Sequence, residues 1–256
     1  MDLTDKVAAV TGAGSGTGRA IAQRLGAESC AVVVADLEAD PGLKTVRLIE
    51  KAGGRAVWVR TDVRIDSDCE GLVAMAEHTY GGLDILVSCA GGTPSPHFPD
   101  ADVRHWSATL ELNLRGPMVA TQAALEGLKR RSGGAIVNIA STAGLGYMPY
   151  ISPEYGAAKA GLIRFTASLA GLRDRMNVRV NCLVPDWILT ARAEGELAAM
   201  EPGERSETPP LLPLDDVVGA VITLLVDDDL AGRVMVMRRE LPPYLIDPTI
   251  DPTQQE

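Results

Sequence analysis

The chain has 256 residues, of which 46% are apolar and 23% are charged, and its formal net charge is −10. These values exclude wholesale disorder and favour one domain with a sizeable core. The acidic balance disfavours nucleic acid as the main ligand, because binding to phosphates requires a basic surface. No apolar run approaches the length of a transmembrane helix, and the acidic start Met1–Lys6 does not have the pattern of a secretory signal.

Short apolar runs alternate along the chain with longer segments that carry apolar residues at helical spacing. This alternation predicts parallel strands joined by right-handed crossovers, and uniformly apolar strands predict a sheet covered on both faces. We therefore expect an α/β fold, a doubly wound parallel sheet in a three-layer sandwich. The expected strands are Val7–Val10, Ala31–Ala35, Ala56–Arg60, Ile85–Ser88, Ala135–Ile139, Val178–Leu183 and Val234–Met237.

Two segments depart from this alternation. Residues 190–213 combine a short helical run with a stretch rich in proline, and they look like an insertion that could act as a lid. Residues 242–256 form a proline-rich acidic tail that we expect to be extended and partly disordered. The expected organisation is one domain over residues 1–241 followed by this tail.

The first expected strand leads into a glycine-rich loop and then into a helix. Glycines let the backbone approach a phosphate closely, and a helix N-terminus supplies free N–H groups and the positive end of the helix dipole. Because the loop lies between a strand and a helix, it predicts dinucleotide binding, although a bare turn is the alternative. The loop reads Thr11-Gly12-Ala13-Gly14-Ser15-Gly16-Thr17-Gly18-Arg19.

The second expected strand is followed by Asp36, about 20 residues after the glycine loop, where a carboxylate can bind the adenosine ribose hydroxyls. A carboxylate would repel a 2′-phosphate, and no Lys or Arg stands at Ser15, Leu37 or Glu38. The sequence therefore favours NAD over NADP as the cofactor. The alternative is a solvated aspartate at the end of a strand.

Tyr155 and Lys159 lie four residues apart, on one face of an expected helix. A nearby ammonium favours the phenolate of tyrosine and makes it usable for acid–base work. Ser141 follows the fifth strand, at the sheet edge where open α/β folds place their sites, and its hydroxyl could orient a substrate oxygen. Asn113 lies in an apolar helical stretch where its amide needs partners. Taken singly, each residue also fits a structural role, such as an exposed helix face for the pair or a helix cap for Ser141.

Together these residues resemble the short-chain dehydrogenase/reductase family over nearly the whole chain, from Asp5 to about Val236. The glycine motif of that family is matched by Thr11, Gly12, Gly16 and Gly18, and the acidic strand end by Asp36. Its other motifs are matched by Asp62-Val63, by Ser88-Cys89-Ala90-Gly91 and by Pro185-Asp186-Trp187-Ile188-Leu189-Thr190. Its catalytic Asn, Ser, Tyr and Lys fall on Asn113, Ser141, Tyr155 and Lys159.

The resemblance implies a Rossmann fold and a role for each of these residues. Tyr155 would exchange a proton with the substrate oxygen, Lys159 would lower the Tyr155 pKa and hold the nicotinamide ribose, and Ser141 would orient the substrate. Asn113 would support a water-linked proton path. The remaining cofactor contacts implied are Gly12, Ser15, Gly16, Thr17, Gly18, Asp36, Asp62, Val63, Ala90, Gly91, Pro185, Ile188 and Thr190.

Four departures from the family pattern stand out. Tyr155 lies fourteen residues after Ser141, one more than is usual, so the intervening loop is lengthened. Ser88-Cys89 replaces two amides, Asp186 replaces a glycine beside the expected nicotinamide site, and Arg238-Arg239 stands where the family often has Asp-Gly-Gly. The family is most often tetrameric, so a homo-oligomer is implied, with helices around Val103–Arg131 and Ser152–Arg175 at the interface. The changed C-terminal end keeps a dimer open.

The leading interpretation is an NAD-dependent enzyme that interconverts a secondary alcohol and a ketone. The alternative is a dehydrogenase-fold protein that binds a dinucleotide but acts as a weakly active sensor or scaffold. Neither membrane nor nucleic acid is expected as a partner. The substrate is a small alcohol or ketone that the sequence does not name, and candidate pocket residues are Thr93, His97, Tyr147, Met148 and Trp187.

A metal site is not expected, because the chain has only three histidines and no carboxylate pair at ligand spacing. His97 is then a solvated loop histidine rather than a ligand. The four cysteines form no CxxC pair, and three of them lie in apolar stretches. We expect free thiols, a reducing compartment and a cytoplasmic location.

Overall fold

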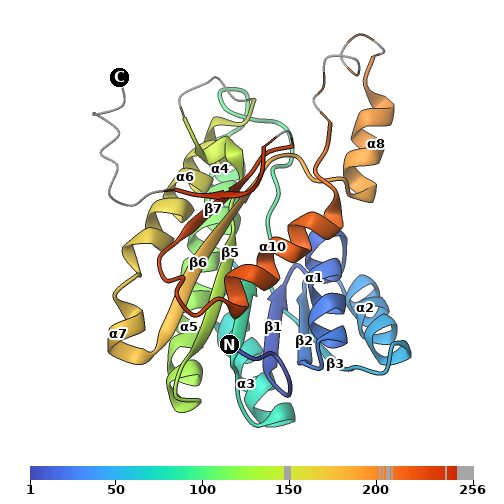
Figure 1. Cartoon of the computed structure of the whole chain (residues 1–256). Coiled ribbons are helices and arrows are strands. Elements are labelled where there is room, and N and C mark those ends of the chain that lie inside the picture. The colour runs from blue at the N-terminus through green and yellow to red at the C-terminus, as the bar shows by residue number, and fades with distance from the viewer. Residues whose placement is uncertain are drawn as a thin grey trace.

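The computed structural model describes residues 1–146, 151–201, 203, 205, 208, 210–239 and 241–246. Within these residues, eight strands form one sheet in the order β3-β2-β1-β4-β5-β6-β7-β8 (Figure 1). All neighbouring strands are parallel except the last pair, β7 and β8. The strands are β1 (Val7–Thr11), β2 (Ala31–Asp36), β3 (Arg55–Arg60), β4 (Ile85–Ser88), β5 (Gly134–Ile139), β6 (Val178–Pro185), β7 (Val234–Met237) and β8 (Tyr244–Leu245).

Helices connect these strands and cover both faces of the sheet, which confirms the predicted α/β class. One face is covered by α1, α2 and α10, and the other by α3, α5 and α6. The helices are α1 (Gly16–Ala27), α2 (Ala39–Lys51), α3 (Asp66–Tyr80), α4 (Val103–Leu110), α5 (Gly116–Arg130), α6 (Pro153–Ser168), α7 (Leu172–Met176), α8 (Ala191–Ala199) and α10 (Leu214–Val226), with a π-helical turn η1 (Glu111–Arg115) and a 3₁₀ turn η2 (Thr142–Gly144).

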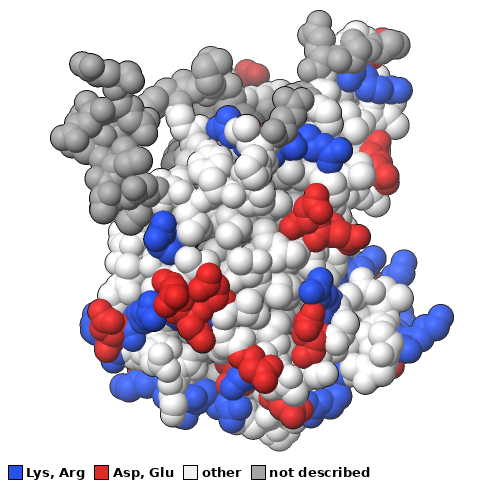
Figure 2. Space-filling model, in the orientation of Figure 1, with Lys and Arg blue, Asp and Glu red and all other residues white. Residues whose placement is uncertain are grey.

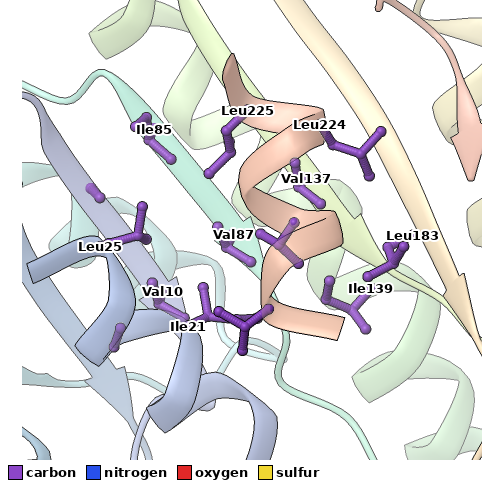
Figure 3. Packing of buried hydrophobic residues seen from close by; sticks show 14 of the residues in the cluster. Val10, Ile21, Leu25, Ile85, Val87, Val137, Ile139, Leu183, Leu224 and Leu225 are labelled. Atoms are coloured by element: carbon purple, nitrogen blue, oxygen red, sulfur yellow. The ribbon is translucent and has the colours of Figure 1, made fainter. Parts of the chain in front are cut away.

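The core follows the alternation of side chains along the strands. In β1, Ala8 and Val10 pack with α1 and α10, whereas Val7 and Ala9 pack with α3 and α5. Figure 3 shows the first of these layers, in which side chains from α10 meet those of β4 and β5. Because every residue of β1, β4 and β5 is buried, these strands read as continuous apolar runs in the sequence.

The predicted strands are confirmed, and most are longer than predicted by one or two residues. β8 lies inside the segment expected to be a tail, and it pairs with β7 through Met235↔Leu245 and Val236↔Tyr244. This strand was not predicted because two residues among prolines give no periodicity. The hydrogen bond from Ile246 N–H to the Val234 carbonyl, at 2.8 Å, shows that the edge of β7 recruits this segment.

The chain reverses its direction of winding between β1 and β4. β1, β2 and β3 run outward to one edge, and the chain then returns to place β4 on the other side of β1. In open α/β sheets a crevice forms at the carboxyl ends of the strands at such a switch point, and ligands bind there. The loops after β1 and β4 therefore mark the place to look for a site.

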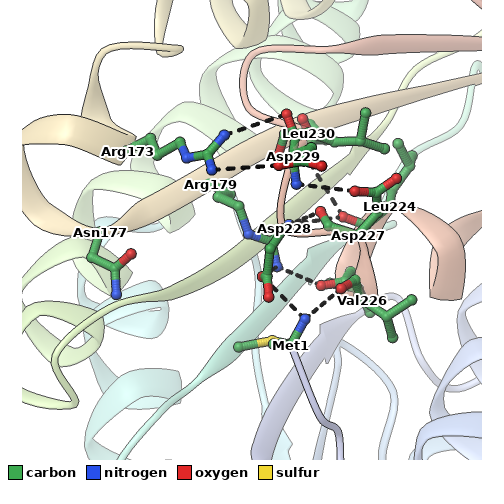
Figure 4. Close-up of polar contacts among 12 residues, drawn as sticks. Met1, Arg173, Asn177, Arg179, Leu224, Val226, Asp227, Asp228, Asp229 and Leu230 are labelled. Atoms are coloured by element: carbon green, nitrogen blue, oxygen red, sulfur yellow. Dashed lines mark hydrogen bonds and ion pairs between the residues drawn. The ribbon is translucent and has the colours of Figure 1, made fainter.

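The opposite end of the sheet, at the amino ends of its strands, carries a network of charged groups (Figure 4). The guanidinium of buried Arg179 donates to the carbonyls of Leu224, Leu225 and Asp227, which satisfies the last turn of α10. Nearby, Arg131 forms an ion pair with buried Asp84 at 3.1 Å. A cavity of about 300 Å³ opens among these groups, but its charges pair with one another and it lies at the amino ends of the strands. This end of the sheet is therefore not the expected site.

Charged side chains are unevenly spread over the face seen in Figure 2. Lysine, arginine and acidic residues gather around the lower end and the sides, and an uncharged area lies over the middle. None of the helices among the described residues has both the length and the apolar character that a bilayer crossing requires.

Candidate functional site

The glycine loop after β1 packs against the turn after β4. Gly12 has φ +65°, and a Cβ there would lie 2.8 Å from the Ala90 Cα; a Cβ on Gly18 would lie 2.2 Å from the Gly12 carbonyl oxygen. Thr11 Oγ1 accepts hydrogen bonds from the N–H groups of Cys89 (3.0 Å) and Ala90 (3.1 Å). A side chain at Gly12 would push the loop and the turn apart, and one at Gly18 would collide with the loop's own backbone, so glycine is required at both.

Asp36 faces the same loop from the end of β2. Its Oδ2 accepts a hydrogen bond from the Gly14 N–H at 2.7 Å, and its Oδ1 accepts one from the Glu38 N–H at 3.1 Å. The carboxylate thus lies directly beside the glycine loop. No lysine or arginine side chain is hydrogen-bonded to Asp36 among the described residues, and Arg19 is turned to the Gly14 carbonyl and to Thr45.

The start of α1 fits a bound diphosphate. The first N–H groups of a helix have no partners within it, and the Ser15 side chain does not cap them. Ser15 and Gly16 are exposed, and Thr17 is partly exposed. A Cβ on Gly16 would lie 3.6 Å from the Thr190 Cγ2, so the loop faces the start of α8. These free donors, the missing side chains and Asp36 together match what a dinucleotide requires.

Tyr155 and Lys159 lie on α6, one turn apart. The Lys159 Nζ is 5.5 Å from the centroid of the Tyr155 ring, and it donates a hydrogen bond to the Ile139 carbonyl at 2.9 Å. Burial lowers the pKa of Lys159 to about 8, against the Coulombic effect of the Cys89 and Cys182 thiols, which raises it. A buried amine with this pKa can gain or lose a proton near neutral pH, and here it lies beside a phenol.

Asn113 lies in the π-helical turn η1 and is fully buried. Its Nδ2 donates to the carbonyls of Gly92 (2.7 Å) and Thr109 (2.9 Å), and its Oδ1 accepts from the Gly92 N–H (3.1 Å). A Cβ on Gly91 would lie 2.8 Å from Asn113 Oδ1 and 3.5 Å from Lys159 Nζ. Asn113 and Lys159 therefore converge on Gly91, next to the turn that the glycine loop contacts.

Ser141 caps the turn η2 at the carboxyl end of β5. Its Oγ accepts a hydrogen bond from the Ala143 N–H at 3.2 Å. The turn lies directly on α6, because a Cβ on Gly144 would lie 2.5 Å from the Ala160 nitrogen, and one on Gly156 would lie 3.2 Å from the Ala143 carbonyl oxygen. The segment that carries Ser141 thus packs on the helix that carries Tyr155.

The segment after β6 completes the wall opposite the glycine loop. Ile188 bridges to Leu212, and the Thr190 Oγ1 caps α8 by accepting from the Ala193 N–H at 3.3 Å. Asp186, which stands after Pro185, accepts hydrogen bonds through Oδ1 from the Trp187 N–H (2.9 Å) and the Thr142 hydroxyl (3.3 Å). Asp186 therefore ties this segment to the turn that follows Ser141.

Asp62 and Val63 follow β3, at the carboxyl edge of the sheet near β2. Arg64 donates to Asp62 through Nε (2.8 Å) and Nη2 (2.6 Å), and these bonds hold the pKa of Asp62 below its usual value. Val63 is buried against Gly116. The side chain of Asp62 is thus engaged by Arg64.

Two of the predicted pocket residues, Thr93 and His97, lie in the loop between β4 and α4 and contact α6. The His97 Nδ1 is 3.1 Å from Glu154 Oε1, and the His97 side chain is only 15% exposed. The expectation of a solvated histidine was wrong, because the His97 ring is largely buried in contact with the Glu154 carboxylate. Tyr147 and Met148 lie outside the described residues, and Trp187 is partly buried. The described residues contain no group of side chains that could hold a metal ion.

Glu154 and Ser152 were not identified from the sequence. The Ser152 hydroxyl donates to Glu154 Oε1 at 2.9 Å and lies 2.6 Å from Thr93 Oγ1. The available signal was an acidic residue in the first turn of the Tyr155 helix. It was not informative alone, because acidic residues are common at that position and the partners lie 57 and 59 residues away.

Comparison with known proteins matches most of the chain to one family. A family model described as "short chain dehydrogenase" matches residues 6–201. An uncharacterized oxidoreductase of Thermotoga maritima is 32% identical and covers 91% of this chain and 92% of its own. A cis-4-hydroxycyclohexanecarboxylate dehydrogenase of Sinomonas cyclohexanicum is 34% identical over 88% of this chain and 91% of its own.

A solved structure with the same fold is that of a 7α-hydroxysteroid dehydrogenase complexed with NADH and 7-oxo glycochenodeoxycholic acid. It superimposes with a TM-score of 0.84 at 27% identity, and the match covers 92% of this chain and 94% of that one.

Proposed function

The chain belongs to the short-chain dehydrogenase/reductase family, and from this we propose that it is an NAD(H)-dependent enzyme that interconverts a secondary alcohol and a ketone. The observation that carries the proposal is the buried ammonium of Lys159, 5.5 Å from the ring of Tyr155, on a helix against which the Ser141 turn packs. A protein that only bound the dinucleotide could use Lys159 to hold the ribose, but it would not need a phenol beside that ammonium.

Four side chains divide the work in the proposed reaction. The Tyr155 hydroxyl gives a proton to the carbonyl oxygen during reduction and takes it back during oxidation. The Lys159 ammonium favours the phenolate that remains, and the Ser141 hydroxyl holds the substrate oxygen toward Tyr155. Asn113 holds the backbone at Gly92 and, with it, the wall of the site. A nicotinamide bound beside Lys159 supplies or accepts the hydride.

The same residues support NAD as the cofactor. We propose that α1 and Gly16 hold the diphosphate, that Asp36 binds the adenosine ribose, and that Asp62, Val63, Ala90 and Gly91 line the adenosine side. Thr190 and the backbone near Pro185 and Ile188 would border the nicotinamide. Asp36 excludes a 2′-phosphate through charge repulsion, since no cation neutralises it among the described residues.

Cyclic alcohols and ketones are the first substrates to test, because the names of two similar proteins refer to a hydroxylated cyclohexane and an oxo-steroid acid. Residues 190–213 are proposed to close over such a substrate. We also propose a cytoplasmic, reducing setting, which is supported by the four free thiols.

The test follows the absorbance of reduced nicotinamide with purified protein and a panel of cyclic and acyclic secondary alcohols and ketones. Turnover with NAD(H) supports the proposal, and binding of NAD without turnover on the whole panel favours the sensor. Calorimetric titration with NAD and NADP tests cofactor choice. Asp36→Ala should narrow the difference between the two affinities, and equal binding by the unaltered protein contradicts the assignment.

A further inference from the structure

The loop between β4 and α4, residues 89–102, contacts Thr11 at Cys89 and Ala90, and its Pro94 carbonyl is 3.0 Å from His105 Nε2 on α4. Two further points join it to η1 and to α6. Its base is fixed at Gly92, whose N–H and carbonyl both bond the Asn113 amide. Its middle is fixed by Glu154 of α6, which accepts hydrogen bonds from the His97 Nδ1 (3.1 Å) and from the Phe98 N–H (3.4 Å). Asn113 is already part of the proposed site, whereas Glu154 and His97 are not explained by it.

Four side chains make up the second point, which we call the His97–Glu154 cluster: Thr93, His97, Ser152 and Glu154. Glu154 Oε1 accepts from both His97 and Ser152, and Ser152 in turn lies 2.6 Å from Thr93. The Glu154 side chain is 4% exposed and the His97 side chain is 15% exposed. Breaking such a pair from one side leaves a buried charge without its partner, which is strongly unfavourable.

Glu154 is held as a carboxylate. Burial would raise its pKa, but hydrogen bonds from its own backbone N–H, Ser152, Phe98 and His97 outweigh burial and lower it. Its place in the first turn of α6 adds the favourable end of the helix dipole. Because a carboxylate only accepts hydrogen bonds, it fixes His97 with a proton on Nδ1 whether the ring is neutral or charged.

The cluster connects the loop to the helical turn that carries Tyr155. Glu154 directly precedes Tyr155, and the Ser152 carbonyl accepts the N–H groups of Tyr155 and Gly156, both at 3.1 Å. A shift of the loop relative to α6 must therefore break contacts to the same turn that sets the direction of the tyrosine. Thr93 and His97 lie on the side of the loop that faces this turn.

We propose that the His97–Glu154 cluster holds the β4–α4 loop against the Tyr155 turn, so that His97 and Glu154 are positioning residues for the substrate, a role that rests on the proposed dehydrogenase function. The loop then forms one wall of the substrate site at a set distance from the acid–base group. Loosening this wall weakens substrate binding more than it slows chemistry, because neither residue touches the reacting atoms.

The kinetic test compares His97→Ala, His97→Asn, Glu154→Gln and the double variant His97→Ala/Glu154→Gln on the best substrate from the screen. We expect His97→Ala to raise KM about 10-fold, with kcat within about threefold and the NAD dissociation constant unchanged. His97→Asn should recover most of the loss, since its amide can donate from near the position of Nδ1. The double variant should be no worse than the worse single variant, because the two residues act as a pair.

Amide hydrogen exchange over residues 91–102 tests the same contact without any substrate. Exchange should become about 10-fold faster in His97→Ala and Glu154→Gln and stay unchanged in His78→Ala, a control at an exposed histidine of α3. Unchanged exchange in His97→Ala overturns the proposal. A KM increase in the double variant equal to the product of the two single increases also overturns it, and so does a fall in kcat with KM unchanged. If the unaltered protein turns over no substrate, the proposed function fails, and exchange alone then decides whether the cluster holds the loop.

Discussion

Tyr155 carries the proton in the proposed reaction, and a single oxygen atom distinguishes it from phenylalanine. Tyr155→Phe should leave the fold intact and reduce turnover by about 10²-fold or more, because it removes the acid–base group alone. Steady-state kinetics give the loss, and a thermal melt of the variant checks the fold. Retained turnover in a folded variant would remove Tyr155 from the mechanism.

The lowered pKa of Lys159 makes the unfolding free energy of the protein rise with pH. Its pKa is about 8 in the folded protein against 10.5 for a free lysine, so between these values the unfolded chain binds more protons and stability rises with pH. Burial raises the pKa of Cys30 and Cys182 to about 12, and these thiols act oppositely, because the unfolded chain loses their protons first. In the unaltered protein, the pH dependence of the unfolding free energy is therefore the sum of two opposing contributions, one from Lys159 and one from the thiols.

The comparison of the unaltered protein with Lys159→Met cancels the contribution of Cys30 and isolates the ammonium together with its Coulombic coupling to Cys89 and Cys182. Without cofactor, the unfolding free energy of the unaltered protein relative to the variant should rise between pH 8 and 10.5, by on the order of 3 kcal/mol. Urea titrations at several pH values measure the difference. A difference that does not vary with pH would show that Lys159 keeps an ordinary pKa in the folded state.

Among single residues, the sequence allowed us to predict those whose role follows from residue type and local spacing. Tyr155 and Lys159 are four residues apart, and Ser141 directly follows a strand, so local patterns place them. Glu154 could not be identified in this way, because its meaning depends on His97, which reaches it across 57 residues of sequence. His97 was misjudged for the same reason, since a loop histidine has no local pattern that reveals a buried partner.

Among the elements, the π-helical turn η1 fixes the base of the β4–α4 loop at Gly92. The turn directs the Asn113 amide to both backbone groups of Gly92, which no regular helical pattern in the sequence indicates. β8 likewise escaped prediction because its pairing depends on the edge of β7. The seven longer strands were predicted because each contains an apolar run, which is a local property. Burial on both faces explains these runs in the inner strands, whereas the edge strand β3 has only a partly buried middle.

Removing the Asn113 amide should therefore affect the element as well as the site. Asn113→Ala leaves the Gly92 N–H and carbonyl without their partner, which should lower the unfolding free energy by about 1–3 kcal/mol and reduce activity. Urea titration measures the first effect and steady-state kinetics the second. Unchanged stability would mean that other groups replace the amide at Gly92.

At the scale of the whole molecule, we propose that copies of the chain assemble through the helices α4–α7. Light scattering at micromolar concentration should give about twice or four times the chain mass of 27.0 kDa, with four times preferred. Met118→Asp on α5 should lower the mass, because Met118 is 40% exposed on this face. Leu43→Asp on α2 is the matched control at 39% exposure, and it should leave the mass unchanged. A monomer in the unaltered protein contradicts the assembly.

The outer strand of the sheet, β3, has a consequence for the protein at high concentration. An edge strand offers unpaired N–H and carbonyl groups to which a strand of another molecule can add. β3 begins at Arg55 and ends at Arg60, both exposed and paired with Asp5 and Asp68 respectively. A strand added there would have to strip water from both arginines and break their ion pairs. The charged ends of β3 therefore act against edge-to-edge aggregation at this side of the sheet, whose other edge strand is β8.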